Sequence, residues 1–259
     1  MFLLNLFRSN SFKTAEVTDF NEADFDYCRL EERRVLNASF AVIGTDLALD
    51  SFVSVDEVTF VDNLGEIQIT LNSGTWNGAD LLGAVTGNGL ATLTLDSSWA
   101  MSLLDVSAGG VDVFFDGPDD IDLGTVVNIE GNRIYQDSFN EILVGGSASL
   151  VGSDIVLSNQ NNDFGGAVSI YSSGDATLVD VNDLTLDTTP VVGSLTASGS
   201  SIALTGTVSA GSAVLTSTVG DITDSGVGNI QVTGTTTLNS TGDVILDNAG
   251  NDFGGAVSI

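Results

Sequence analysis

The sequence predicts an all-β fold, a right-handed parallel β-helix (solenoid), preceded by a short N-terminal helical or disordered segment. Two observations lead to this prediction. The 17-residue segment Asp154–Ile170 returns as Asp243–Ile259 with 12 identical positions, an offset of 89 residues. Between the two copies, short runs rich in Val, Ile, Leu and Thr alternate larger with smaller side chains, which is the two-residue period of a β-strand.

Five strand starts mark the coils of the predicted solenoid. They follow one another at spacings of 21, 26, 20 and 22 residues, and they are Asp154–Leu157, Asp175–Leu178, Ser201–Leu204, Asp221–Asp224 and Asp243–Leu246. This period suits one coil of a β-helix, because a propeller blade needs about 40 to 45 residues. The 89-residue repeat is therefore predicted to be four coils, and the chain from Val35 onward about ten at about 22 residues each. Gly, at 30 of 259 positions, disfavours helix and supplies turns.

The chain divides into three predicted regions. Residues 1–38 form a separate N-terminal segment, and residues 152–259 carry the β-helix repeats, which are predicted to be truncated at the C-terminus. Residues 39–151 form an irregular β region without an 89-residue copy. Because terminal repeats must cover the end of the core, this region is predicted to be the N-terminal capping part of the solenoid, with a separate small β-sandwich as the alternative. Its strand candidates are Phe40–Ile43, Phe52–Val55, Glu57–Val61, Glu66–Leu71, Ala91–Leu95, Val111–Phe115 and Thr125–Ile129.

The N-terminal segment favours one short helix. Asn21 is a suitable N-cap, and Phe20, Ala23, Tyr27 and Leu30 fall at helical spacing. The single cysteine, Cys28, can form no internal disulfide, so packing and hydrogen bonds must hold the fold.

Charge excludes one class of partner. From Val35 onward the chain has one base, Arg133, against 28 acids, a net charge of −27. So acidic a body repels nucleic acid, and no nucleic-acid partner is predicted. No run of 18 apolar residues is present, so no transmembrane segment is predicted either.

One acidic turn is the candidate for site chemistry. It carries four carboxylates within seven residues, which are Asp116, Asp119, Asp120 and Asp122. Carboxylate oxygens are calcium ligands, so calcium is the one cofactor considered, although an exposed acidic turn is the favoured interpretation. The pair Asp119 and Asp120 also leaves a β-helical glycosidase fragment as an alternative, beside a calcium-stabilised surface module. The chain has no His and the body a single base, so it is predicted not to be an enzyme.

The segment Leu30–Ala38 resembles a known sorting motif. Leu30, Glu31, Arg33 and Leu36 match the Leu-Glu-x-Arg-x-x-Leu pattern of large secreted or surface repeat proteins of planctomycete-type bacteria. The sequence departs from the tighter pattern at Glu32, where proline often stands. This resemblance implies that residues 1–38 are an N-terminal sorting or secretion segment, which directs export to the exterior or the cell surface of a bacterium.

The body separately resembles repeats of the filamentous-haemagglutinin type. The resemblance covers residues 152–259 and rests on the pattern Asp-x-x-Leu-x-Asn-x-x-Asn-Asp-Phe-Gly-Gly-Ala-Val, which both copies of the 17-residue segment share. It implies a non-enzymatic, adhesin-like or structural stalk, whose partners would be surface polysaccharide or another cell-surface protein. The last coil is also predicted to leave strand edges uncovered at Ile259, so copies are expected to associate end to end unless their high negative charge prevents it.

Overall fold

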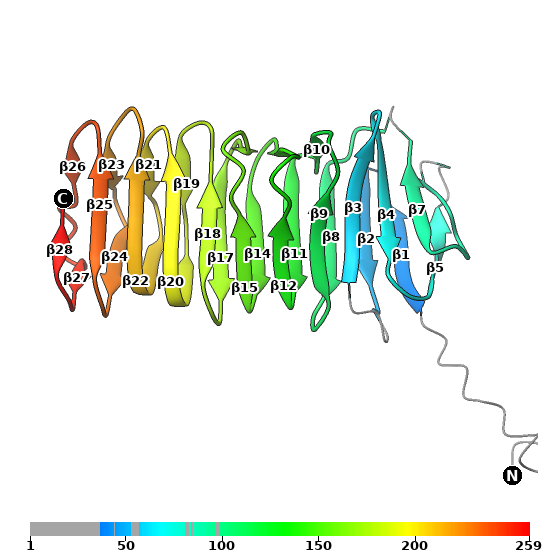
Figure 1. Ribbon diagram of the computed structural model, residues 1–259, viewed down its shortest axis with the longest axis horizontal. Helices are drawn as coiled ribbons and strands as arrows, with labels where there is room; N and C mark the ends of the chain where they lie inside the picture. The colour runs from blue at the N-terminus through cyan, green and yellow to red at the C-terminus, as the bar shows by residue number, and fades with distance from the viewer. Residues whose placement is uncertain (1–36, 44, 53–56, 81–82, 84, 97–98) are drawn as a thin grey trace, which may run out of the picture. The chain divides into compact units, whose positions relative to one another are not determined.

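The structure is a computed structural model (Figure 1) that describes residues 37–43, 45–52, 57–80, 83, 85–96 and 99–259. These residues belong to one compact unit, Leu36–Ile259. Within them every regular element is a β-strand, and none of them forms a helix. The predicted N-terminal helix, Cys28 and the sorting residues Leu30, Glu31, Arg33 and Leu36 lie outside the described residues.

Parallel pairing between successive coils builds the fold and confirms the predicted parallel β-solenoid. Each coil advances the chain by 18 to 23 residues, as the pairs Leu184 with Ile202 and Leu103 with Val126 show. The stack from β9 to β28 takes about seven turns, fewer than the ten predicted. The right-handed sense of winding remains a prediction, and it is the rule for parallel crossovers.

The early coils have three sides, each a stack of strands. The first side comprises β8 (Leu103–Ala108), β11 (Val126–Gly131), β14 (Ala148–Gly152) and β17 (Ala167–Ser172). The second comprises β9 (Asp112–Asp116), β12 (Arg133–Gln136), β15 (Asp154–Leu157) and β18 (Ala176–Val179). The third, a separate three-stranded sheet, comprises β10 (Ile121–Asp122), β13 (Ile142–Val144) and β16 (Asp163–Phe164).

In the later coils the strands are divided differently among the three sides. Two long strands, β20 (Thr189–Gly199) and β22 (Thr207–Ser217), turn one corner each, with a register shift between Val191 and Ser194. They continue into β24 (Asn229–Val232) and β25 (Thr236–Ser240), then into β27 (Asp252–Phe253) and β28 (Val257–Ser258). The remaining side comprises β19 (Leu184–Leu186), β21 (Ile202–Leu204), β23 (Ile222–Asp224) and β26 (Val244–Ile245).

The first seven strands are not coils. They are β1 (Asn37–Ile43), β2 (Asp46–Asp50), β3 (Glu57–Asn63), β4 (Glu66–Leu71), β5 (Thr75–Asp80), β6 (Val85–Thr86) and β7 (Thr92–Leu95). Four antiparallel pairings join them, while β2 and β3 pair in parallel with β8 and β9. Hairpins thus cover the first coil, and they belong to the same compact unit as the coils.

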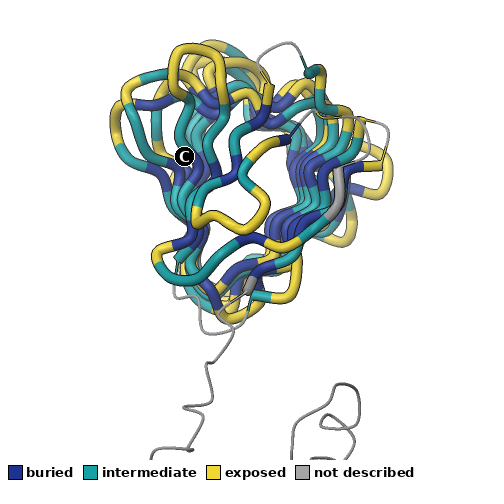
Figure 2. The backbone as a smooth tube through the Cα atoms, turned by 90° about the vertical axis from the view of Figure 1, so that its right-hand side faces the viewer, coloured by how far each residue is buried: buried dark blue, intermediate teal, exposed yellow. Residues whose placement is uncertain are grey.

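Alternating side chains create the core. In β15, Ile155 and Leu157 are buried and their neighbours are half-buried, which is the period-two pattern read from the sequence. Figure 2 shows buried segments on the inside of the coils and exposed ones mainly at the turns. Ile155 stacks on Ala176, which stacks on Leu195, so inward residues meet their counterparts one coil away. Phe164 of the 17-residue segment also packs in this core and is 2% exposed.

The 89-residue repeat does not coincide with whole coils. Four pairings lead from Ile155 to a residue 81 positions further on, passing through Ala176, Leu195, Ala213 and Thr236. The repeat counterpart of Ile155 is instead Val244 in β26, which pairs with β23 on the next side of the coil. The repeat therefore spans four coils and one further side, where the sequence predicted four coils.

Glycines stand where neighbouring coils approach most closely. A Cβ on Gly211 would lie 2.7 Å from the Val192 carbonyl oxygen and 2.8 Å from that of Gly193. Similar contacts of 2.8 Å and 2.5 Å with the glycine one coil earlier exist at Gly193 and Gly234. These corners accept no side chain because the obstacle is rigid backbone.

Gly211→Ala is predicted to lower the free energy of unfolding by about 1 to 3 kcal/mol, because the added methyl group overlaps two carbonyl oxygens. Urea denaturation measures this. The matched control is Gly109→Ala, whose Cβ meets only the flexible Glu130 carboxylate, 3.1 Å away, and should change stability by less than about 0.5 kcal/mol. Equal stability of the two variants would contradict the close approach of the coils.

Candidate functional site

The acidic turn that the sequence singled out joins β9 to β10. Asp116 accepts a hydrogen bond from the Gly117 amide at 2.8 Å, and Asp122 accepts one from the Gly124 amide at 2.9 Å. In the described part of the chain, no three acidic, His or Cys side chains are grouped so that they could hold a metal ion. Asp116, Asp119, Asp120 and Asp122 are therefore not brought together as one ligand set.

Asp122 lines a pocket, and neither Asp119 nor Asp120 belongs to its lining. The pocket measures about 450 Å³ and lies between the hairpin cap and the first coils. Asp62, Asp96 and Trp99 contribute to the same walls. Because Asp62 accepts a hydrogen bond from the Gly65 amide at 2.7 Å, that carboxylate stabilises the β3–β4 turn.

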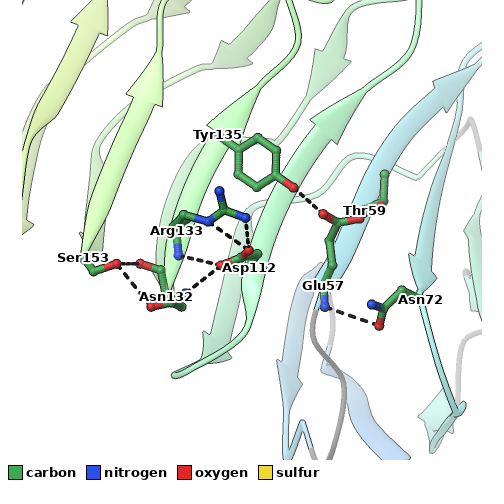
Figure 3. A network of polar contacts seen from close by, with 8 residues as sticks. All are labelled: Glu57, Thr59, Asn72, Asp112, Asn132, Arg133, Tyr135 and Ser153. Atoms are coloured by element: carbon green, nitrogen blue, oxygen red, sulfur yellow. Dashed lines mark hydrogen bonds and ion pairs between the residues drawn. The ribbon is translucent and has the colours of Figure 1, made fainter.

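A polar network surrounds Arg133, the single base after Val35 (Figure 3). Arg133 forms an ion pair with Asp112 one coil earlier, and its Nε donates to Asp112 Oδ2 at 2.9 Å. The guanidinium also lies 5.0 Å from the centre of the Tyr135 ring. The hydrogen bond from Arg133 holds the pKa of Asp112 below its usual range. The one positive charge of the body is thus engaged between two coils.

The same network ties the hairpin cap to the coils. Tyr135 in β12 donates its hydroxyl hydrogen bond to Glu57 in β3, two strands away on the same face. Its ring stacks on Phe114, with 4.5 Å between ring centres. Burial, and then the hydrogen bond to Glu57, raise the pKa of Tyr135 to about 12. The phenol therefore remains a hydrogen-bond donor at neutral pH, and it fastens β3 across β9.

Aspartates at the strand starts bond the next coil. The side chain of Asp175 accepts a hydrogen bond from the Ser194 amide at 2.8 Å, and Asp221 accepts one from the Asp243 amide at 2.7 Å. Asp112 does the same for the Arg133 amide at 3.2 Å. This contact gives a physical reason for Asp at the starts of the runs that begin at Asp175 and Asp221, because the carboxylate fixes a backbone amide of the next coil.

The asparagines of the 17-residue segment form the most elaborate contacts. Asn162 accepts a hydrogen bond from the Ile142 amide at 2.9 Å and donates one to Gln136 at 3.0 Å, both in earlier coils. Its Oδ1 also accepts a hydrogen bond from Gln136 Nε2 at 2.6 Å. We call this arrangement the asparagine bracket. Asn162 and Gln136 are both buried, so the bracket satisfies polar atoms inside the solenoid.

The second copy repeats the bracket. Asn251 accepts a hydrogen bond from the Ile230 amide at 2.9 Å and donates one to Asp224 at 2.6 Å. The Asp224 carboxylate also accepts the Asp247 and Asn248 amides at 3.0 and 3.2 Å. The 89-residue repeat therefore preserves a contact to the coil before it, even though its two copies lie on different sides.

Gln136 and Asp224 were not singled out from the sequence, although a signal was present. Each is the last residue of its strand and points inward. In the next coil the residue in register is a leucine, which is Leu157 for Gln136 and Leu246 for Asp224. In the run Asp221–Asp224 the last residue breaks the pattern of the other four strand starts, which all end in Leu. A polar residue at this inward position marks the coil that precedes a bracket.

Asp180 is a buried acid outside the bracket. It is 3% exposed, and its Oδ1 accepts a hydrogen bond from the Asn182 amide at 2.9 Å, while its Oδ2 has no hydrogen bond of normal geometry. Burial, with smaller contributions from Asp163 and Asp183, raises the pKa of Asp180 to about 6. Ionisation of Asp180 therefore costs stability, and this cost develops as the pH rises from about 4 to 6.

The coils and their brackets define the chain as a repetitive parallel β-solenoid protein. A family model described as repeats of unknown function (DUF5649) matches residues 91–171 and 194–259, more than half of the chain. The chain therefore belongs to this family. Each matched stretch carries one copy of the 17-residue segment near its carboxyl end. No curated protein and no solved structure matches the chain.

Asn162→Ala is predicted to lower the free energy of unfolding by about 2 to 4 kcal/mol, because it leaves the buried Ile142 amide without its acceptor and removes both hydrogen bonds between Asn162 and Gln136. Urea denaturation measures the loss. Asn161→Ala serves as the control, since Asn161 is exposed and its side chain bonds only Glu141 at the surface, and it should cost less than about 1 kcal/mol. A loss at Asn162 no larger than that at Asn161 would argue against the bracket.

Asp180→Asn is predicted to stabilise the protein above pH 6 and to change little below pH 4. Because the folded pKa is raised from 3.8 to about 6, the ionisation penalty is absent below about pH 4, accumulates as the pH rises from about 4 to 6, and is nearly constant above that. A shift of this size corresponds to about 3 kcal/mol at pH 8. Denaturation at pH 4, 6 and 8 measures it, with the exposed Asp120→Asn as control for loss of one charge. A gain that is equal at all three pH values would refute the buried charge.

Proposed function

We propose that this protein is a non-enzymatic, secreted or cell-surface structural repeat protein of a bacterium, which acts as an adhesin-like stalk or scaffold. The family match and the parallel β-solenoid support the structural part of this proposal. The adhesin-like part, the filamentous-haemagglutinin kinship and the planctomycete-type origin rest on the sequence resemblances alone.

One observation carries the proposal. The polar side chains that recur with the repeat, Asn162 and Asn251 with their partners, bond the neighbouring coils instead of converging on a pocket. The aspartates of the strand starts do the same through Asp175 and Asp221. Because the polar residues that recur with the repeat make contacts between coils, the repeat serves to keep the solenoid continuous. In such a fold each unit contacts chiefly its neighbours. A solenoid of this kind can gain or lose coils while the remaining coils keep the same structure.

The residue inventory supports a non-enzymatic role. The chain has no His, and its one base after Val35, Arg133, is paired with Asp112. General acid–base chemistry and stabilisation of anionic intermediates commonly use His, Lys or Arg side chains. In the body, general acid–base chemistry would have to come chiefly from aspartate, glutamate and tyrosine side chains.

The proposed location rests on charge and on the sorting segment. A net charge of −29 keeps copies of the protein apart and in solution, which suits a surface-displayed stalk. The motif at Leu30, Glu31, Arg33 and Leu36 would direct export. Both features are compatible with the described residues, in which no helix is long and apolar enough to cross a membrane.

Immunogold labelling of intact cells of the source organism, with antibodies raised against residues 37–259, tests the proposal. We predict label on the cell surface or in the surrounding medium. A second measurement with the same antibodies follows a strain in which Leu30 and Arg33 are both changed to Ala, where surface label should fall. Label confined to the cytoplasm of permeabilised wild-type cells would overturn the surface role.

A further inference from the structure

A shallow groove follows one corner of the coils, and we call it the corner groove. One of its walls is a column of outward residues in register, namely Glu130, Val151, Tyr171, Pro190, Ser209 and Gln231. Two pockets of about 500 Å³ each lie along it, and Val192 lines both. The first extends from Gly109 to Val192 and the second from Val191 to Gly254, so together they follow the corner across successive coils.

The floor of the corner groove is glycine-rich backbone. Gly131, Gly152 and Gly211 line the two pockets. At Gly211 a Cβ would lie within 2.8 Å of backbone carbonyl oxygens of the preceding coil, so no side chain can fill the floor there. The packing of the coils therefore keeps the groove open, and the wall side chains decide what it holds.

The walls combine apolar surface with neutral hydrogen-bonding groups. Val151, Tyr171 and Val192 are 37%, 46% and 73% exposed, so an aromatic ring and two aliphatic side chains face the solvent. Asn132, Ser153 and Ser173 line the same pocket. Although the chain has 35 acidic residues, the lining of the two pockets includes two of them, Glu130 and Asp252. The middle of the groove is thus uncharged.

The backbone of the floor leaves little for a peptide strand to bind. The amides of Ser153, Ser173 and Gly193 already donate to carbonyls one coil earlier, at 2.6, 3.1 and 2.9 Å. A partner in this groove must instead use hydroxyl groups and apolar C–H faces. Sugar rings present both, and the apolar face of a ring packs on an aromatic side chain such as Tyr171. An anionic polymer would be repelled by a chain with a net charge of −29, so an uncharged one is favoured.

We propose that the corner groove binds an extended, uncharged polysaccharide chain along the axis of the coils, with Tyr171 as the stacking residue. Successive coils advance by about 4.8 Å, roughly the length of one sugar residue, so one sugar would lie over each coil. This inference rests on the proposed surface role and names the class of partner for it. Affinity would come from several weak contacts repeated along one polymer.

Affinity electrophoresis of the full-length protein in gels containing neutral glucans, mannans, xylans or galactans tests the proposal. We predict retardation by at least one of these polysaccharides. Tyr171→Ala should weaken the binding about tenfold or more, because it removes the exposed ring. Ser173→Trp, which fills the groove from an exposed position, should weaken it similarly. Unchanged thermal melts of both variants would show that the fold is intact.

Phe139→Ala is the matched control. Phe139 is an aromatic residue, 75% exposed, that lines neither pocket of the groove, so its removal should leave the retardation unchanged. Retardation by no polysaccharide of the panel would overturn the corner groove as a glycan site. Retardation that survives both Tyr171→Ala and Ser173→Trp would also overturn it. Neither result bears on the surface labelling that tests the proposed function, so the two failures are distinguishable.

Discussion

The backbone hydrogen bonds between successive coils are the interaction on which the rest of this structure depends. Parallel pairing places each residue about 4.8 Å from its register partner, so every position must be compatible with the position one coil away. Inward positions therefore stack apolar residues on apolar residues, as in the series Ile155, Ala176 and Leu195. At the tightest corners only glycine fits, since a Cβ at Gly234 would lie 2.5 Å from the Gly211 carbonyl oxygen.

The same constraint assigns roles to the polar residues. Groups inside or between coils, such as the Asn162 bracket and the Asp112–Arg133 pair, bond to the preceding coil and keep the stack in register. Groups that face outward are released from that requirement, and they can vary along the axis. The corner groove combines both, because its glycine floor follows from coil packing while its walls, Val151 and Tyr171 among them, are outward residues. A binding surface and a scaffold thus share one corner.

Much of the fold could be predicted from the sequence, because strand period and turn residues are local signals. The strand candidates at Glu57–Val61, Glu66–Leu71 and Ala91–Leu95 closely match β3, β4 and β7. Coil register could not be predicted in the same way, because it depends on how many residues each corner takes. The 26-residue spacing from Asp175 to Ser201 passes from one side to the next, since Ala176 pairs with Leu195. The brackets were likewise missed, because Gln136 and Asn162 lie 26 residues apart and only the fold brings them together.

Disulfide formation between engineered cysteines is the measurement that tests the stacking of the coils most directly. In a Cys28→Ser background, cysteines replacing Thr177 and Thr196 are in register on the outward face of neighbouring coils, within the reach of a disulfide. Cysteines replacing Thr177 and Ser198 lie on the same face but two residues out of register. Under mild oxidation we predict rapid crosslinking of the first pair and little of the second. Preferential crosslinking of the second pair would contradict the coil register, and with it the brackets and the corner groove.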